Sequence, residues 1–89
     1  KNWKDGQRQK VKFSFKEHRE YDTIDDEIAD LEEQIRLTET EITASVSDYV
    51  KLQELSDRKE ELEVLLAEKM ERWVYLNDLA ERIANGEME

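Results

Sequence analysis

Apolar side chains recur in two long runs of this 89-residue chain, at spacings of three, four or seven residues. The first run is Tyr21, Ile24, Ile28, Leu31, Ile35 and Ile42, and the second is Leu52, Leu55, Leu62, Leu66, Trp73, Leu76 and Ile83. This spacing places each run along one narrow strip of an α-helix, as in a coiled-coil seam. The sequence therefore predicts an all-α fold, an intramolecular antiparallel two-helix coiled-coil hairpin with a short N-terminal lead-in helix or extended segment.

A turn centred between Asp48 and Tyr49 would pair the two runs apolar with apolar at nearly every step. The expected pairs are Ile42 with Leu55, Ile35 with Leu62, Leu31 with Leu66, Ile24 with Trp73 and Tyr21 with Leu76. This agreement favours a monomeric hairpin over a parallel dimer, whose seam would have to cross residues 45–48. Three polar residues interrupt the seam, and we interpret them as specifying the pairing, with ligand recognition as the alternative. They are Thr38, Lys59 and Lys69.

Local signals set the expected boundaries. Ser14 and Glu17 form a capping-box pattern, and the segment 23–26 offers a second, similar helix start. Ser47 or Asp48 can cap the second helix. The expected organisation is a basic linker over 1–12, a hairpin over 13–86 and a tail over 87–89, with helix 1 at about 14–44, a possible break near 22–23, a turn at about 45–48 and helix 2 at about 48–85.

The base of the hairpin carries more apolar surface than the seam requires, most of all around Trp73. We expect Phe13 and Phe15 to cover it, because they lie next to the start of the first helix. Trp73 is interpreted as packing at this base rather than as part of a ligand box. Ser14 and Glu17 complete the set of residues with an expected structural role.

Composition argues against chemistry within the chain. The apolar fraction of 37% is too small for a core enclosing a deep pocket, there is no Cys, and His18 stands alone. Adjacent carboxylates abound, but on a solvated rod nothing tunes their pKa values for acid-base catalysis. No run approaches the roughly 18 apolar residues of a membrane span. We therefore expect no catalytic, cofactor or metal site, no membrane contact and a cytoplasmic location.

Charge divides the chain into a basic arm and an acidic rod. Residues 1–20 contain seven basic and three acidic residues, a net charge of +4, which leaves −14 for residues 21–89. Lysine and arginine bind nucleic acids by neutralising phosphates, and the interleaved aromatics Trp3, Phe13 and Phe15 could stack on bases. The candidate nucleic-acid-binding residues are Lys10, Lys12, Lys16 and Arg19; the alternative is a solvated linker and helix start.

Two segments resemble a known family. The segment 12–21, KFSFKEHREY, resembles the KLSYKEQRELE opening of the C-terminal domain of ABC-F ATPases of the Uup type. The segment 47–55 fits that family's turn and helix restart, and the segment 71–81 fits its ERWxxLxxLxE ending. The likeness covers about residues 10–84. Where the family often has Leu-Pro, this chain has Ile24 and Asp25, so a softer kink is expected there.

This resemblance implies a C-terminal appendage to two ATP-binding cassettes that lack transmembrane segments, with ATP and Mg²⁺ bound by the parent protein. The chain has no GxxxxGK[ST] phosphate loop, so it should not hydrolyse ATP itself. Its start at Lys1 is interpreted as that of a fragment of a longer protein. The resemblance implies contact with DNA, or with ribosomal RNA on the ribosome, that positions or regulates the cassettes. The alternative is a protein-interaction or purely structural hairpin without nucleic-acid binding.

Overall fold

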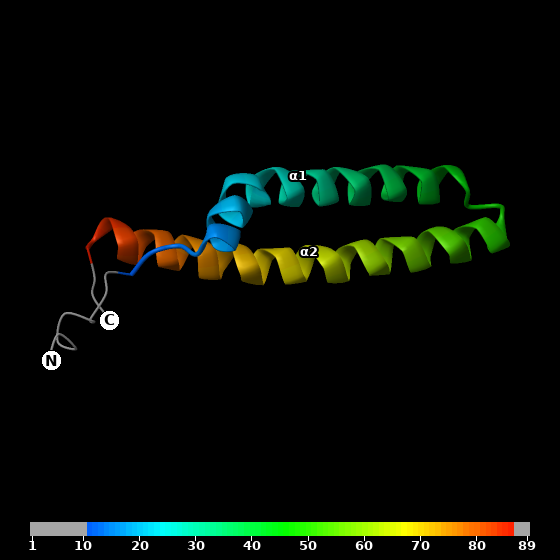
Figure 1. Cartoon of the computed structure of the whole chain (residues 1–89). Coiled ribbons are helices and arrows are strands. Elements are labelled where there is room, and N and C mark those ends of the chain that lie inside the picture. The colour runs from blue at the N-terminus through cyan, green and yellow to red at the C-terminus, as the bar shows by residue number, and fades with distance from the viewer. Residues whose placement is uncertain (1–10, 87–89) are drawn as a thin grey trace, which may run out of the picture.

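The computed structural model describes residues 11–86 and contains two long antiparallel helices joined by a short turn (Figure 1). α1 spans Phe15–Ala44 and α2 spans Tyr49–Ala84. The described part of the chain contains no strand, and the two helices pack along each other. The predicted all-α helical hairpin is therefore confirmed. Lys10 and most of the expected linker, together with the tail 87–89, lie outside the described residues.

Each helix begins at a side-chain cap. Ser14 Oγ accepts a hydrogen bond from the Glu17 amide at 3.1 Å, and Glu17 Oε1 accepts one from the Ser14 amide at 2.9 Å. At the start of α2, Asp48 Oδ1 accepts from the Lys51 amide at 3.1 Å. These bonds satisfy amides that have no partner within the first turn of a helix. Asp48, and not Ser47, is thus the N-cap of α2.

The cap of α2 gives a direct test of this boundary. Replacing Asp48 by alanine should lower the free energy of unfolding by about 1 kcal/mol, because the Lys51 amide loses its acceptor. Replacing Ser47 by alanine is the matched control and should change stability much less. Urea denaturation followed by circular dichroism measures both variants. Equal losses in the two would contradict the assignment of Asp48 as the cap.

The end of α2 depends on one glycine. Gly86 has a φ of 69°, in the left-handed region that a side chain disfavours. Its amide donates to the Ile83 carbonyl at 3.0 Å, and the Asn85 amide donates to the Glu81 carbonyl at 3.0 Å. The Asn-Gly pair therefore closes the last turn of the helix.

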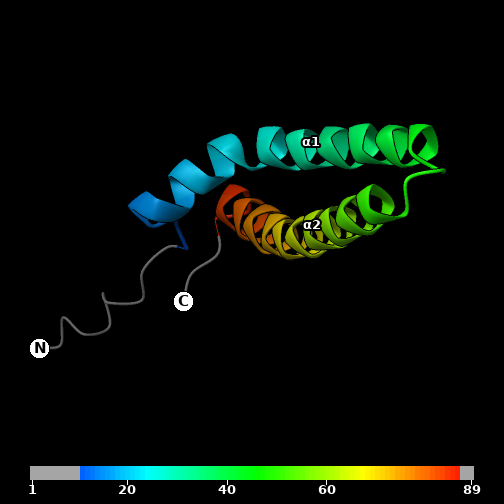
Figure 2. The ribbon, with the colours of Figure 1, turned by 90° about the vertical axis from the view of Figure 1, so that its right-hand side faces the viewer.

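α1 is one continuous helix through residues 22–23, where the sequence left room for a break. The Thr23 hydroxyl donates back to the carbonyls of Arg19 and Glu20, at 3.2 and 3.5 Å. A threonine that bonds to its preceding turn in this way favours bending of a helix. Figure 2 shows the N-terminal turns of α1 (blue to cyan) running at an angle to the rest of the helix. The second start signal thus accompanies a bend and not a new helix.

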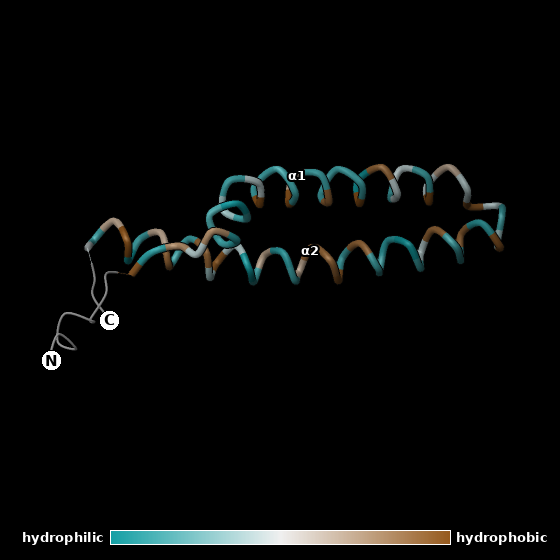
Figure 3. Tube along the Cα trace, viewed as in Figure 1, coloured by the Kyte–Doolittle hydropathy of each residue, from teal (hydrophilic) through white to brown (hydrophobic). Residues whose placement is uncertain are grey.

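The core is the seam itself. The buried side chains within the two helices are Ile24, Thr38, Leu55, Leu62, Leu76 and Leu79. Figure 3 shows the hydrophobic positions of α1 recurring on the side that faces α2, between stretches of hydrophilic residues. Ile24 and Leu76 are the most completely buried, at 2% and 0% exposure. The core therefore has its tightest packing toward the base of the hairpin.

The three polar seam residues find partners within the hairpin. The buried Thr38 hydroxyl donates to the Gln34 carbonyl at 2.8 Å. Lys59 Nζ lies 3.1 Å from Glu39 Oε2, and Lys69 Nζ lies 2.9 Å from Glu27 Oε1. Both ion pairs follow the register expected from a turn centred between residues 48 and 49, to within one residue. Each of the three residues therefore has a partner inside the hairpin, and their role in specifying the pairing stays an interpretation.

Candidate nucleic-acid interface at the base of the hairpin

The base of the hairpin consists of the lead-in 11–14, the first turns of α1 and the last turns of α2. In Figure 1 the lead-in (blue) runs beside the C-terminal turns of α2 (orange). Val11 is only 6% exposed, and the Phe13 ring lies 5.0 Å from the Tyr21 ring and 6.1 Å from the His18 ring, centroid to centroid. Val11 and Phe13 therefore cover apolar surface at this end. Phe15, which was expected to share this role, is 80% exposed.

Four polar side chains join the bent start of α1 to α2, and we call Glu17, Glu20, Arg72 and Tyr75 the polar clasp. The Tyr75 hydroxyl donates to Glu17 Oε2 at 2.6 Å. Arg72 donates two hydrogen bonds to Glu20, at 3.0 and 2.8 Å, and its guanidinium carbon lies 4.7 Å from the Tyr75 ring centroid. Bidentate arginine–carboxylate pairs fix orientation as well as distance. The clasp thus sets the angle at which the first turns of α1 meet α2.

Hydrogen bonding shifts the pKa values of all four clasp residues. The Ser14 amide, followed by the Tyr75 hydroxyl, lowers the pKa of Glu17 below its ordinary value of 4.5. The Arg72 guanidinium lowers the pKa of Glu20 in the same direction, and Glu20 in turn raises the pKa of Arg72. The bond to Glu17 raises the pKa of the Tyr75 hydroxyl above 10.0. Each shift favours the protonation state that makes the clasp.

The lowered pKa of Glu20 predicts a pH-dependent contribution to stability. A carboxylate whose pKa is lower in the folded state than in the unfolded state stabilises the fold at pH values above its unfolded-state pKa. This stabilisation is lost as the pH falls through the pKa of the folded state. The stability difference between the parent and a Glu20→Gln variant should therefore shrink as the pH is lowered below about 4.5. Urea denaturation at a series of pH values measures it.

The matched control for this pH series is the same substitution in a chain that lacks the guanidinium. In an Arg72→Gln background, Glu20→Gln should remove little further pH dependence, because the two side chains act as a pair. Comparison within each pair of variants cancels the effect of pH on the net charge of −10. An undiminished pH effect without Arg72 would contradict the assigned cause.

The predicted nucleic-acid-binding residues lie on the lead-in and the first turns of α1. Lys12, Lys16 and Arg19, which we call the basic cluster, are all exposed. Among the described residues none of the three has a carboxylate oxygen within 4.0 Å. Lys59, Lys69 and Arg72 of α2, in contrast, each hold a glutamate of α1. Lys10, the fourth candidate, lies outside the described residues.

A shallow depression of about 320 Å³ joins part of this cluster to α2, and we call it the basal depression. It is lined by Phe15, Lys16, Arg19, Glu20, Thr23, Glu27 and Lys69. Its two carboxylates are held by cations, Glu20 by Arg72 and Glu27 by Lys69. Lys16 and Arg19 therefore leave it with an uncompensated positive charge. The sequence indicates Lys69 only as a seam residue. No local sequence pattern shows that it lies beside the start of α1, which is about fifty residues earlier in the chain.

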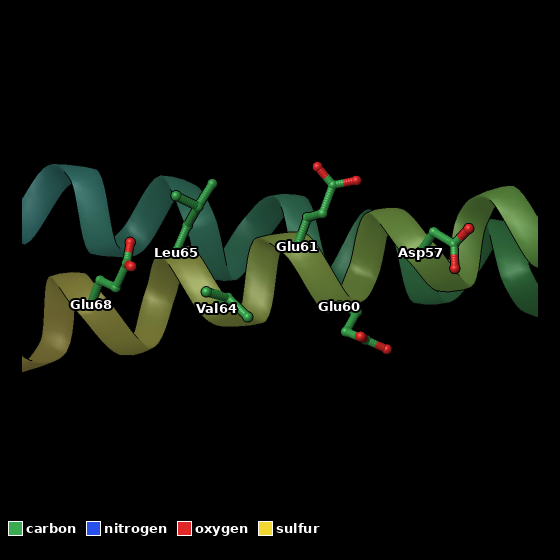
Figure 4. A pocket seen from close by; sticks show the side chains of 6 residues that line it. All are labelled: Asp57, Glu60, Glu61, Val64, Leu65 and Glu68. Carbon is green, nitrogen blue, oxygen red and sulfur yellow. The ribbon is translucent and has the colours of Figure 1, made fainter.

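The outward side of α2 has the opposite character. A wide, open hollow of about 650 Å³ is lined by Asp57, Glu60, Glu61, Val64, Leu65 and Glu68, all on this one helix (Figure 4). Four of the six side chains are carboxylates, whereas Val64 and Leu65 are about half exposed. This face repels a polyanion.

A third hollow of about 250 Å³, the apolar groove, is lined by Asp25, Ile28, Glu32, Met70 and Trp73. The Trp73 indole nitrogen donates to Asp25 Oδ1 at 2.7 Å, and the side chain remains 36% exposed. Trp73 therefore packs at the edge between the helices and joins them through its polar atom. Trp73 is therefore less buried than a core residue, and its structural role stays a prediction.

The described residues also bear on metal and membrane contact. Within residues 11–86 no three or more His, Asp or Glu side chains come together as a metal site would require. His18 Nδ1 lies 3.3 Å from Asp22 Oδ2 on the solvent side of α1. In the same part of the chain, neither helix is both long and apolar enough to cross a membrane.

Comparison with known proteins identifies the family. A family model described as the ABC transporter C-terminal domain matches residues 12–78. An uncharacterized ABC transporter ATP-binding protein of Bacillus subtilis (strain 168), YfmR, is 36% identical over 76 residues, which are 85% of this chain but only 12% of that protein. No solved structure matches. The chain belongs to the ABC transporter C-terminal domain family, as its resemblance to the C-terminal domain of ABC-F ATPases predicted.

Proposed function

We propose that this domain contacts nucleic acid, DNA or structured RNA such as that of the ribosome, through the base of the hairpin. The observation that carries the proposal is the basic cluster. Lys12, Lys16 and Arg19 are exposed and hold no carboxylate within 4.0 Å among the described residues, in a chain whose net charge is −10. Exposed cations without an ion pair to a carboxylate are available to phosphates.

The electrostatics support binding that is weak, independent of sequence and confined to one end. Lysine and arginine release counterions when they neutralise phosphates, so the affinity falls as salt is added. The carboxylates of the outward side of α2 repel the same phosphates. Nucleic acid would therefore meet the basic cluster while the rod extends away from it.

The proposal also assigns this domain a role toward the rest of a longer protein. The relative from Bacillus is an ATP-binding protein of which this chain spans 12%, and the chain itself has no phosphate loop. ATP and Mg²⁺ would thus be bound by cassettes elsewhere in such a protein, in the cytoplasm. By holding nucleic acid at its base, the hairpin would position or regulate those cassettes.

Salt-dependent binding tests the proposal. We expect Lys16→Gln/Arg19→Gln to reduce the slope of log affinity against log salt by about two, because each phosphate contact contributes about one. The matched control is Lys51→Gln/Arg58→Gln, which removes one exposed lysine and one exposed arginine of α2 away from the base. Fluorescence anisotropy with labelled duplex DNA and an RNA stem-loop measures both variants. Affinity insensitive to salt, or equal losses in both variants, would contradict the proposal.

A protein-interaction role is the second candidate, and the exposed apolar side chains around the apolar groove favour it. Met70 is 43% exposed and Val74 is 59% exposed, next to Trp73. If the cassettes of the parent protein cover this surface, Met70→Glu/Val74→Glu should abolish capture of the isolated cassettes by the hairpin. A neutral Met70→Gln/Val74→Gln variant should weaken the same capture and leave nucleic-acid binding unaffected, because it adds no charge that would repel phosphates. Loss of both activities together would show that the two roles cannot be separated on this surface.

A further inference from the structure

We infer that Phe15 is a stacking platform for an unpaired base, so that the site at the base of the hairpin prefers single-stranded nucleic acid to a continuous duplex. The inference rests on the proposed function. Phe15 is the first residue of α1, and at 80% it is the most exposed of the large hydrophobic side chains in the described part of the chain. Its ring therefore does not pack in the core of the hairpin.

The neighbouring aromatic residue shows the contrast. The Phe13 ring lies between Tyr21 and His18, at 5.0 and 6.1 Å, and only part of it is open to solvent. Of the two described aromatic residues that the sequence placed among the lysines, Phe15 is thus the one that can receive a base.

The surroundings of Phe15 suit a nucleotide. The Arg19 guanidinium carbon lies 5.8 Å from the ring centroid, over the ring, and Lys16 lines the same basal depression. A base placed on Phe15 would bring its phosphates within reach of Lys16 and Arg19, which hold no carboxylate within 4.0 Å among the described residues. Aromatic rings set among such cations are the usual arrangement of sequence-tolerant single-strand binders.

The preference for single strands follows from access to the base. Inside a duplex each base is stacked between its neighbours, and a protein ring reaches a base face only where the strand is unpaired. Phosphate contacts, in contrast, are available on both forms. Phe15 should therefore add affinity for single strands alone, and the basic cluster should add affinity for both.

The experiment compares Phe15→Leu, which keeps an apolar side chain without a π face, with Phe15→Trp, which keeps a ring. Probes are single-stranded DNA, single-stranded RNA of the same sequence and a long blunt DNA duplex. Phe15→Leu should weaken binding of both single strands about tenfold and leave duplex binding unchanged, whereas Phe15→Trp should retain it. Tyr49→Leu is the control, because Tyr49 is 71% exposed at the far end of the rod and should have no effect.

The outcomes separate this inference from the proposed function. If Phe15→Leu leaves the binding of both single strands unchanged, or weakens duplex binding by the same factor, Phe15 is not a stacking platform. In that case the salt slope of Lys16→Gln/Arg19→Gln can still support phosphate contact. If the parent domain binds none of the probes at low salt, the platform and the proposed function both fail. A loss with RNA and none with DNA would also overturn base stacking as the cause, since both carry the same base faces.

Discussion

Replacing Leu76 by alanine is expected to lower the free energy of unfolding by about 3 to 4 kcal/mol. Leu76 is 0% exposed, so its loss removes buried apolar surface and leaves a cavity that neighbouring side chains fill only in part. A chain of this length is stabilised by about 4 to 13 kcal/mol in total. The variant should therefore be close to the limit of folding, with a clearly lower midpoint in urea denaturation.

The matched control for Leu76 is Leu65→Ala, the same change on the same helix. Leu65 is 48% exposed, and substitutions at such surface positions alter stability by about 0.5 kcal/mol. Circular dichroism under identical conditions compares the two variants. If they lose similar stability, α2 does not present Leu76 to the seam.

The second large effect is expected at Trp73. Replacing it by alanine should lower the free energy of unfolding by about 2 kcal/mol, less than the 3 to 5 kcal/mol of a fully buried aromatic residue. The reason is its position at the edge of the helix pair, where 36% of it remains exposed and the indole nitrogen bonds Asp25 at 2.7 Å. Chemical denaturation of the isolated hairpin measures the change.

A second substitution at the same position divides this effect into its parts. Trp73→Phe keeps most of the packing and loses the donor to Asp25, so it should account for about 1 kcal/mol of the loss. A loss below about 0.5 kcal/mol in Trp73→Ala would show that the side chain contributes little to the fold. The apolar groove would then be a free contact surface.

Much of the hairpin was predictable because its signals are local or periodic. The spacing of Ile24, Leu55 and Leu62 reports which side of each helix is buried, and all three lie in the core. The capping box of Ser14 and Glu17 is contained within four residues, so nothing distant is needed to form it. The same periodicity does not predict how deeply each seam residue is buried. Trp73, for example, is a seam position but lies at the edge of the helix pair.

The polar clasp could not be predicted in the same way. Tyr75 meets Glu17 across 58 positions, and Arg72 meets Glu20 across 52. Both contacts depend on the direction of the first turns of α1. That direction is set by the bend, at which the Thr23 hydroxyl donates to the Arg19 carbonyl. Heptad spacing describes straight, supercoiled helices, and it says little about side chains that meet where one helix bends.

The position of the candidate site could be predicted from the sequence in part. Lys12, Lys16 and Arg19 stand out in the sequence as cations within a short basic arm, and the structure places them on one end of the rod. Which aromatic residue remains exposed beside them is decided by packing. Phe13 contacts Tyr21, whereas Phe15 is exposed beside Arg19, and the alternation of the two residues in the sequence leaves this difference open.

The bend of α1 and the polar clasp make the hairpin a lever whose pivot is at its base. The 24 residues of α2 from Tyr49 to Arg72 extend about 36 Å at about 1.5 Å per residue. A rotation of about 10° at the pivot therefore displaces the turn at residues 45–48 by about 6 Å. Two hydrogen-bonded carboxylates, Glu17 and Glu20, help to hold that angle. Small changes in their contacts are thus amplified into large movements of the opposite end.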